Sequence, residues 1–185
     1  MGKIQVSTCE IEGLRVITPQ VFEDIRGYFL ETYHKKDYEE AGITADFVQD
    51  NQSRSVQGVL RGLHYQKNYP QAKLMRVLKG EIFDVAVDIR EGSKTYGKWF
   101  GLVLSEENKK QLFIPEGFAH GFLVLSEVAE IAYKCSDFYQ PNDEGGILWS
   151  DEEIGIAWPI PEGLEVLLSE KDQQWKGLSE TISNK

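Results

Sequence analysis

Alternation of apolar and polar residues over short stretches constrains the fold of this chain more than any other feature. In residues 83–89 the odd positions are all apolar, and the even positions carry two aspartates and an alanine. A period of two is typical of a β-strand that buries one face. Similar runs, separated by Gly, Asn, Ser and Pro turns, occupy residues 13–17, 28–33, 59–64, 73–78, 99–104, 111–114, 121–125 and 130–135. Many short strands predict an all-β barrel or sandwich.

Helical signals are few and short. Residues 35–41, which precede Gly42, predict about two helical turns that end at a glycine, and residues 163–168 are ambiguous. We expect both segments to lie outside the barrel. The 185 residues contain no internal repeat, charge run or Gly/Ser linker, so we predict one domain over residues 1–185.

The net charge and the short apolar runs exclude several classes of binding partner and of cellular location. A net charge of −10 opposes non-specific attraction to nucleic acid or to an anionic membrane, so an anionic ligand needs a local basic pocket. The longest apolar runs, such as residues 121–125, are far too short to span a bilayer. The first residues lack the apolar core of a secretory signal, and Cys9 and Cys135 have no CxxC spacing. We therefore expect a cytoplasmic protein with two reduced thiols.

Two of the predicted strands carry polar residues whose role the pattern leaves open. Asp84 and Asp88 either face water, the interpretation we favour for Asp88, or line a polar barrel interior. His64 follows Arg61 by three positions, so the two side chains face opposite ways unless Gly62 introduces a bulge. His64 is accordingly either a catalytic group or a hydrogen-bonded structural histidine.

The other two histidines suggest different roles. His34 follows a predicted strand end and is expected at the surface. His120 ends a Pro-x-Gly-x-x-His element, residues 115–120, which resembles a motif of the cupin jelly-roll barrel. Metal-binding cupins also supply a His-x-His element, because a divalent metal needs three or four convergent ligands. Here that element reads His-Tyr-Gln at residues 64–66, so a histidine is missing and we predict no metal site.

A closer resemblance is carried by eight segments in order along the chain. They are residues 22–29, 47–51, 59–66, 71–74, 84–90, 115–122, 129–134 and 169–172. In sequence and spacing, the chain resembles the dTDP-4-dehydrorhamnose 3,5-epimerase family over nearly its whole length. The resemblance implies an all-β, cupin-type jelly-roll β-barrel with short peripheral helices.

The resemblance also implies a reaction. The family epimerises dTDP-4-dehydro-6-deoxy-D-glucose at carbons 3 and 5 to dTDP-4-dehydro-L-rhamnose, on the route to dTDP-L-rhamnose. The ketone at carbon 4 acidifies both hydrogens, so the chemistry needs a base, an acid on the opposite ring face and a group that stabilises the enolate. By position in the family's motifs, the base is His64, its carboxylate partner Asp172, the acid Tyr133 and the enolate stabiliser Lys73. No cofactor is implied.

Further positions match the family's substrate contacts. Arg61 and Lys171 match contacts to the diphosphate, with Arg26 nearby, and the planar guanidinium of arginine suits phosphate. The matches in the thymidine and sugar region are Gln49, Asn51, Glu31, Glu144 and His120. Family members are homodimers in which N-terminal residues of one chain complete the other chain's pocket. Arg26 and Glu31 could therefore act from the partner chain.

Three alternatives stay open on the sequence. The enzyme could invert only one carbon of a related dTDP-4-keto-deoxysugar, because placement of the sugar decides how many protons exchange. A metal-free cupin could instead bind a sugar nucleotide without turnover, although the joint presence of the four catalytic residues argues against it. A metal-dependent cupin oxygenase or isomerase is disfavoured by Gln66.

Overall fold

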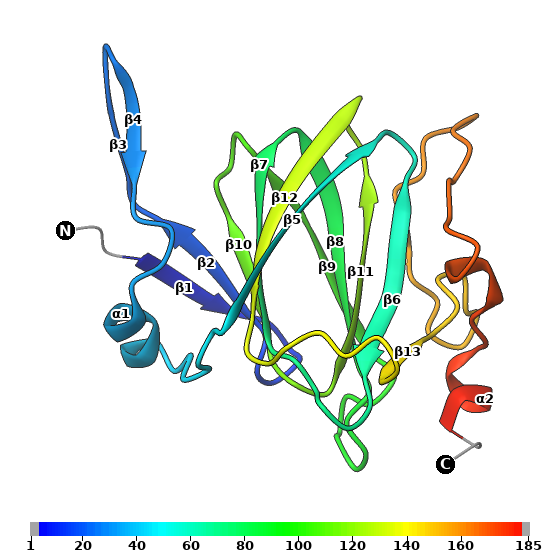
Figure 1. Ribbon diagram of the computed structural model, residues 1–185. Helices are drawn as coiled ribbons and strands as arrows, with labels where there is room; N and C mark the ends of the chain where they lie inside the picture. The colour runs from blue at the N-terminus through cyan, green and yellow to red at the C-terminus, as the bar shows by residue number, and fades with distance from the viewer. Residues whose placement is uncertain (1–3, 183–185) are drawn as a thin grey trace.

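Two antiparallel β-sheets, packed face to face, form the body of the molecule (Figure 1). The computed structural model describes residues 4–182. The six-stranded sheet has the order β1 (Ile4–Thr8), β2 (Arg15–Pro19), β10 (Gln111–Ile114), β7 (Lys73–Lys79), β12 (Val128–Cys135) and β5 (Gln49–Val56). The five-stranded sheet has the order β13 (Glu144–Gly146), β6 (Leu60–Gln66), β11 (Phe118–Val124), β8 (Glu81–Asp88) and β9 (Trp99–Ser105). The all-β prediction is confirmed.

The remaining elements are short and peripheral. They are the hairpin of β3 (Val21–Asp24) and β4 (Gly27–Leu30), the helices α1 (Lys35–Glu40) and α2 (Leu178–Ile182), and the 3₁₀ turn η1 (Asp172–Gln174). α1 lies where the sequence predicts a helix of about two turns. In the part of the chain that the structure describes, no helix is long and apolar enough to cross a membrane.

The main hydrophobic core lies between the two sheets. Met75, Leu112 and Ile131 enter it from the six-stranded sheet, and Ile82 and Phe122 enter it from the five-stranded sheet. All five are at most 5 % exposed. Each buried side chain of this size contributes roughly 1.5–3 kcal/mol to stability. This packing fixes which strand positions face the interior of the barrel.

Chain segments from both ends cover the outer faces of the sheets. Tyr38 of α1 packs with Ile17 and Phe113 against the six-stranded sheet. In the C-terminal segment, Trp158 and Leu178 pack against the five-stranded sheet. Figure 1 shows this segment running beside β6.

The alternating pattern located most strands but missed four. All nine predicted runs overlap a strand, whereas β1, β3, β5 and β13 were not predicted. Residues 163–168, which were ambiguous, form no helix. Instead, Leu167 pairs with Val59 in an isolated parallel bridge.

The bulge at Gly62, which the sequence leaves open, is present. β6 and β11 pair His64 with His120 but Arg61 with Phe122, so the register shifts by one residue opposite Gly62. Gly62 has a φ of +127°, and a Cβ there would lie 2.5 Å from a backbone carbon of β11. A bulge that brings two backbones this close requires glycine.

Asp84 and Asp88 are both fully buried, so the expectation that Asp88 faces water is wrong. Asp88 accepts hydrogen bonds from Arg90 Nε at 2.9 Å, Ser93 Oγ at 2.6 Å and Thr95 Oγ1 at 2.7 Å. Burial alone would raise the pKa of Asp88, but these bonds outweigh it and hold the pKa well below its ordinary value. Asp88 thus anchors the turn that follows β8.

The β3–β4 hairpin, residues 21–30, projects away from the body of the molecule, and we name it the arm (Figure 1). It carries five large exposed apolar side chains, namely Val21, Phe22, Ile25, Tyr28 and Phe29. An isolated two-stranded hairpin is only marginally stable in water, and grouped exposed apolar side chains mark interaction surfaces. The arm therefore has the character of a contact surface.

Candidate active site

A cavity of about 360 Å³ is lined by strands of both sheets. Seven of the twelve predicted site residues line it: Gln49, Asn51, Arg61, His64, Lys73, Tyr133 and Glu144. Tyr65, Gln66, Gln71 and Tyr139 complete the lining. The bulge at Gly62 has a direct consequence here, because both Arg61 and His64 of β6 reach the same cavity.

His64 is paired with Asp172, 108 residues further along the chain. Its Nε2 lies 2.5 Å from Asp172 Oδ1. Asp172 is only 2 % exposed. Burial alone would raise the pKa of Asp172, but the hydrogen bonds from His64, Ser169 and Trp175 and the charge of His64 lower it overall. An ionised carboxylate only accepts hydrogen bonds, so the neutral imidazole has its proton on Nε2 and its lone pair on Nδ1.

Trp175 also belongs to this site, although it is not among the residues selected from the sequence. Its Nε1 donates a hydrogen bond of 3.2 Å to Asp172 Oδ1. Its ring lies edge-on to the His64 imidazole, with 6.4 Å between ring centroids. The available sequence signal was spacing, because side chains three residues apart lie on the same side of a 3₁₀ turn.

Glu144 faces the other nitrogen of His64. Its Oε1 lies 3.8 Å from His64 Nδ1, while its Oε2 accepts a hydrogen bond of 2.7 Å from the Tyr139 hydroxyl and pairs with Lys171. Burial alone would raise the pKa of Glu144, but the bonds from Lys171 and Tyr139 lower it overall. The bond to Glu144 is the main cause that raises the pKa of Tyr139 to about 12. Glu144 thus brings Lys171, a predicted phosphate contact, to the cavity.

Lys73 and Tyr133 come from neighbouring strands of the six-stranded sheet. β7 and β12 pair Lys73 with Cys135 and Met75 with Tyr133, so the Lys73 and Tyr133 side chains share one face. Burial lowers the pKa of Lys73, although nearby negative groups oppose this effect, and burial raises the pKa of Tyr133. Tyr133 is therefore a protonated phenol at neutral pH, as a proton donor must be.

His120 does not line the cavity. It is buried on β11 opposite His64, and its Nε2 lies 3.0 and 3.2 Å from the two carboxylate oxygens of Asp84. Burial lowers the pKa of His120. His120 and Asp84 therefore form a buried polar pair inside the barrel, beside His64 and outside the residues that line the cavity.

Gln66 stands where metal-binding cupins carry the second histidine of their His-x-His element. Its Nε2 donates to the backbone oxygens of Tyr69 at 2.6 Å and Phe138 at 3.3 Å, and its Oε1 accepts from the backbone N–H of Gln140 at 2.7 Å. Gln66 thus ties together the two loops beside the cavity.

Arg26 and Glu31, two of the predicted binding residues, do not line the cavity of their own chain. Arg26 lies at the tip of the arm and pairs with Asp24. Glu31 lies near His34 and Asp37. Within residues 4–182, these three residues form the only group of three side chains close enough to share a metal ion. His34 is exposed, as predicted, and its Nδ1 accepts from the Asp37 N–H at the start of α1.

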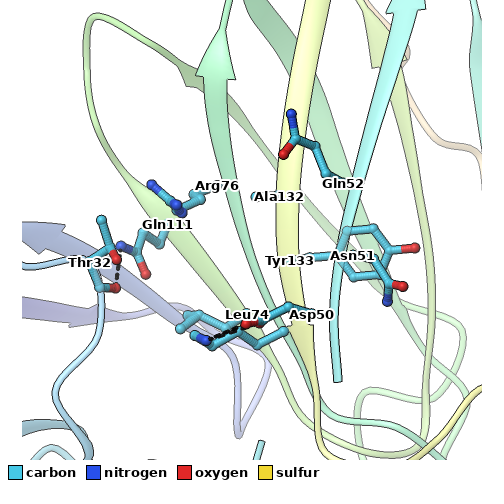
Figure 2. A pocket seen from close by; sticks show the side chains of 10 residues that line it. Thr32, Asp50, Asn51, Gln52, Leu74, Arg76, Gln111, Ala132 and Tyr133 are labelled. Atoms are coloured by element: carbon cyan, nitrogen blue, oxygen red, sulfur yellow. Dashed lines mark hydrogen bonds and ion pairs between the residues drawn. The ribbon is translucent and has the colours of Figure 1, made fainter. Parts of the chain in front are cut away.

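A second hollow, of about 480 Å³, lies on the outer side of the six-stranded sheet (Figure 2). Its lining consists of Thr32, Asp50, Asn51, Gln52, Leu74, Arg76, Gln111, Ala132, Tyr133 and Lys134. Figure 2 shows the Gln111 side chain turned toward Thr32, whose carbonyl accepts its hydrogen bond of 2.9 Å. The hollow shares Asn51 and Tyr133 with the first cavity but lacks His64 and Lys73, so the acid–base groups belong to the first cavity.

Titratable side chains that line one cavity of a cupin-type barrel are typical of an enzyme that moves protons. Comparison with known proteins narrows this class. A family model described as dTDP-4-dehydrorhamnose 3,5-epimerase matches residues 8–180. The chain belongs to the dTDP-4-dehydrorhamnose 3,5-epimerase family.

Individual relatives are similar over almost the whole chain. A dTDP-4-dehydrorhamnose 3,5-epimerase of Methanothermobacter thermautotrophicus is 51% identical over 180 residues, covering 97% of each chain. The protein of the same name from Shigella flexneri is 55% identical over 171 residues, covering 91% of this chain and 93% of its own. Among solved structures, dTDP-6-deoxy-D-glucose-3,5-epimerase RmlC from Legionella pneumophila, in complex with dTDP-4-keto-L-rhamnose, matches with a TM-score of 0.92 and 52% identity, covering 95% and 93% of the two chains. The predicted cupin-type jelly roll is confirmed by this match.

Proposed function

We propose that this protein epimerises dTDP-4-dehydro-6-deoxy-D-glucose at carbons 3 and 5 to dTDP-4-dehydro-L-rhamnose, a step in dTDP-L-rhamnose biosynthesis. One observation carries the proposal besides the family: a single cavity is lined by His64 from one sheet and Tyr133 from the other. Inversion requires a proton to leave one face of the sugar ring and another to arrive on the opposite face. A base and an acid on different sheets meet this requirement.

The proposed steps follow from the chemistry of a 4-ketosugar. His64 Nδ1 takes the proton from carbon 3 or carbon 5, and the electron pair moves to the ketone oxygen to give an enolate. The Asp172 carboxylate stabilises the imidazolium, and the Lys73 ammonium stabilises the enolate oxygen. Tyr133 then donates a proton to the opposite face of the same carbon. Once His64 has released its proton to solvent and Tyr133 has taken one up from solvent, the same steps repeat at the other carbon. There is no net oxidation, so the reaction calls for no redox cofactor.

The proposed diphosphate contacts are Arg61 and Lys171. Arg61 Nε and Nη2 donate to Ser55 Oγ at 3.2 and 3.1 Å, which orients the guanidinium beside the cavity. Lys171 pairs with Glu144 in the free protein, and we infer that it exchanges this partner for phosphate when substrate binds. The remaining proposed contacts to the sugar and the thymidine are Gln49, Asn51, Glu144 and His120.

We also propose a homodimer in which the arm of one chain completes the cavity of the other. The exposed apolar side chains of the arm support this proposal. So does the position of Arg26 and Glu31, which do not line the cavity of their own chain. In a two-fold dimer, the same exchange gives two equivalent sites, each with Arg26 and Glu31 from the partner.

The proposed setting is a single-domain enzyme in the cytoplasm. Cys9 and Cys135 are both unpaired, which suits a reducing compartment. The proposed partners do not include nucleic acid or membranes, in keeping with the net charge of −10.

The experiment is deuterium exchange in heavy water, followed by proton NMR of the sugar. The wild-type protein should incorporate deuterium at both carbon 3 and carbon 5 and form product. His64→Ala should slow exchange and product formation at least about 100-fold, because a positioned general base contributes that much, while dTDP still binds. Exchange at one carbon only would reveal a single-carbon epimerase. Binding of the sugar nucleotide without any exchange would reveal a non-catalytic cupin. Wild-type exchange in His64→Ala would refute the assigned base.

A further inference from the structure

Trp175 has no part in the steps above, yet it contacts both members of the His64–Asp172 pair. Asp172 Oδ1 accepts from Trp175 Nε1 at 3.2 Å and lies 2.5 Å from His64 Nε2. One carboxylate oxygen therefore holds two donors. Asp172 is 2 % exposed, so water has little access to replace either donor. Rotation of the carboxylate away from His64 would break both bonds together.

The indole of Trp175 is fixed from more than one side. A Cβ on Gly146 would lie 2.2 Å from indole Cε2, so the backbone of β13 supports the ring at a distance that only glycine allows. The Lys171 ammonium lies 5.7 Å from the centroid of the ring, within the range of a cation–π contact. The ring is therefore a rigid support for its N–H group.

We propose that Trp175 is a positioning residue that holds the Asp172 carboxylate against His64 and limits how strongly that carboxylate retains the imidazole proton. The inference rests on the proposed function of His64 as the base. A donor to Oδ1 spreads the negative charge of the carboxylate, which leaves less of it to hold a proton on the imidazole. Such a base must both take up and release its proton in each catalytic cycle.

Other charged and titratable groups also face His64, and Trp175→Phe leaves all of them in place. Glu144 Oε1 lies 3.8 Å from His64 Nδ1, and Glu144 forms an ion pair with Lys171. His120 lies opposite His64 on β11. Lys73 and Tyr133 line the same cavity. A change in the titration of His64 in this variant is therefore assigned to the loss of the indole N–H.

Trp175→Phe keeps an aromatic ring over Gly146 and removes the donor. Without it, the carboxylate retains the imidazole proton more strongly, so the acidic limb of the kcat/KM profile should move upward by about 0.5 pH unit. kcat should fall about 10-fold, with KM changed less than about twofold, because positioning acts on the chemical step. The matched control is Trp158→Phe, which removes an indole donor to the Trp149 carbonyl at 2.9 Å, outside the cavity. It should leave both the acidic limb and kcat unchanged.

A measurement on the wild-type protein needs no variant to fold. In NMR spectra recorded against pH, the indole Hε1 signal of Trp175 should shift with the same midpoint as the His64 ring signals, because both groups bond one carboxylate oxygen. An indole signal that stays constant while His64 titrates would overturn the proposal. So would a Trp175→Phe profile that coincides with that of Trp158→Phe. The NMR result does not depend on turnover, so it stands apart from the His64→Ala exchange experiment that decides the proposed function.

Discussion

At the residue scale, burial shifts the pKa values of the proposed enolate stabiliser and the proposed acid, both on the six-stranded sheet, in opposite directions. It lowers the pKa of Lys73 and raises that of Tyr133. Desolvation disfavours the charged form of each group, so the ammonium holds its proton less firmly and the phenol holds its proton more firmly. An enolate formed between them meets a nearby cation and a donor that is fully protonated at neutral pH.

Tyr133→Phe should separate proton abstraction from inversion. His64 can still form the enolate and Lys73 can still stabilise it, but no acid is available on the opposite face of the ring. We expect product formation to fall about 100-fold or more, while solvent deuterium still enters the recovered substrate. The measurement is the ratio of deuterium in recovered substrate to product formed in one sample. A ratio equal to that of the wild-type protein would rule out Tyr133 as the acid.

The proposed acid–base residues could be predicted from family motifs in the sequence, but the side chains that surround them in the fold could not. Resemblance to family motifs selected His64 and Asp172, and the structure brings them within hydrogen-bond distance, although their catalytic roles stay predictions. Trp175 was not predicted because its one sequence signal, a spacing of three residues from Asp172, does not show that the indole donates to the carboxylate. Asp88 was misjudged for a similar reason, since its donors come from the turn that follows its strand.

At the scale of elements, β5 shows how a strand with polar surroundings is missed from the sequence. β5 reads Gln-Asp-Asn-Gln-Ser-Arg-Ser-Val and lacks an apolar period. Gln49 and Asn51 of this strand line the first cavity, whereas Asp50 and Gln52 line the outer hollow. A hydrophobic pattern predicts strands that border the core. It cannot predict one that has a ligand-sized hollow on each side.

Gly62→Ala should destabilise the pairing of β6 with β11. The new Cβ would lie 2.5 Å from the backbone of β11, at a φ of +127°. The matched control is Gly163→Ala, which has a φ of +81° but no atom within 4 Å of the new Cβ. The control should cost ~1–2 kcal/mol from backbone strain alone, and Gly62→Ala should cost clearly more. Urea unfolding of both variants measures the difference, and equal losses would contradict the close approach at the bulge.

Asp88→Asn should reduce stability at neutral pH and flatten its dependence on pH. The folded-state pKa of Asp88 lies below the unfolded value of about 3.9, so the folded state binds fewer protons in the acid range. Its contribution is complete above the unfolded pKa and is lost as the pH falls toward the folded pKa. We expect a loss of about 1–3 kcal/mol at pH 7 and a smaller loss at pH 3.

The measurement is urea unfolding at both pH values, with Asp46→Asn as the control. Asp46 is exposed and pairs with Lys35 at the surface, so its variant should keep the wild-type response to pH. An Asp88→Asn protein that keeps the wild-type decline between pH 7 and pH 3 would show that the network around Asp88 does not stabilise the fold.

At the scale of the whole molecule, the proposed exchange of arms makes a prediction about mixed dimers. His64→Ala and Arg26→Ala should each be weakly active alone. A dimer with one chain of each kind contains one site with an intact His64 and an intact partner arm, and a second site that lacks both residues. Random pairing of equal amounts should therefore restore about a quarter of the wild-type activity.

The mixture should be unfolded and refolded together so that subunits exchange, and its activity compared with the two variants refolded separately. Recovery no greater than the mean of the two separate samples would exclude a contribution of Arg26 across the interface. The Arg61→Ala variant provides the control, because Arg61 and His64 line the same cavity and cannot complement one another.

His64 and Tyr133 lie on different sheets, so the packing of the barrel interior sets the distance between them. Packed sheets lie roughly 10 Å apart, and the bulk of the side chains between them sets that separation. Met75 and Phe122 belong to this interior and do not line the cavity, so in the proposed reaction they help to set the distance between base and acid. Relatives with identical acid–base residues could thus differ in whether one carbon or two is inverted, through changes confined to their interiors.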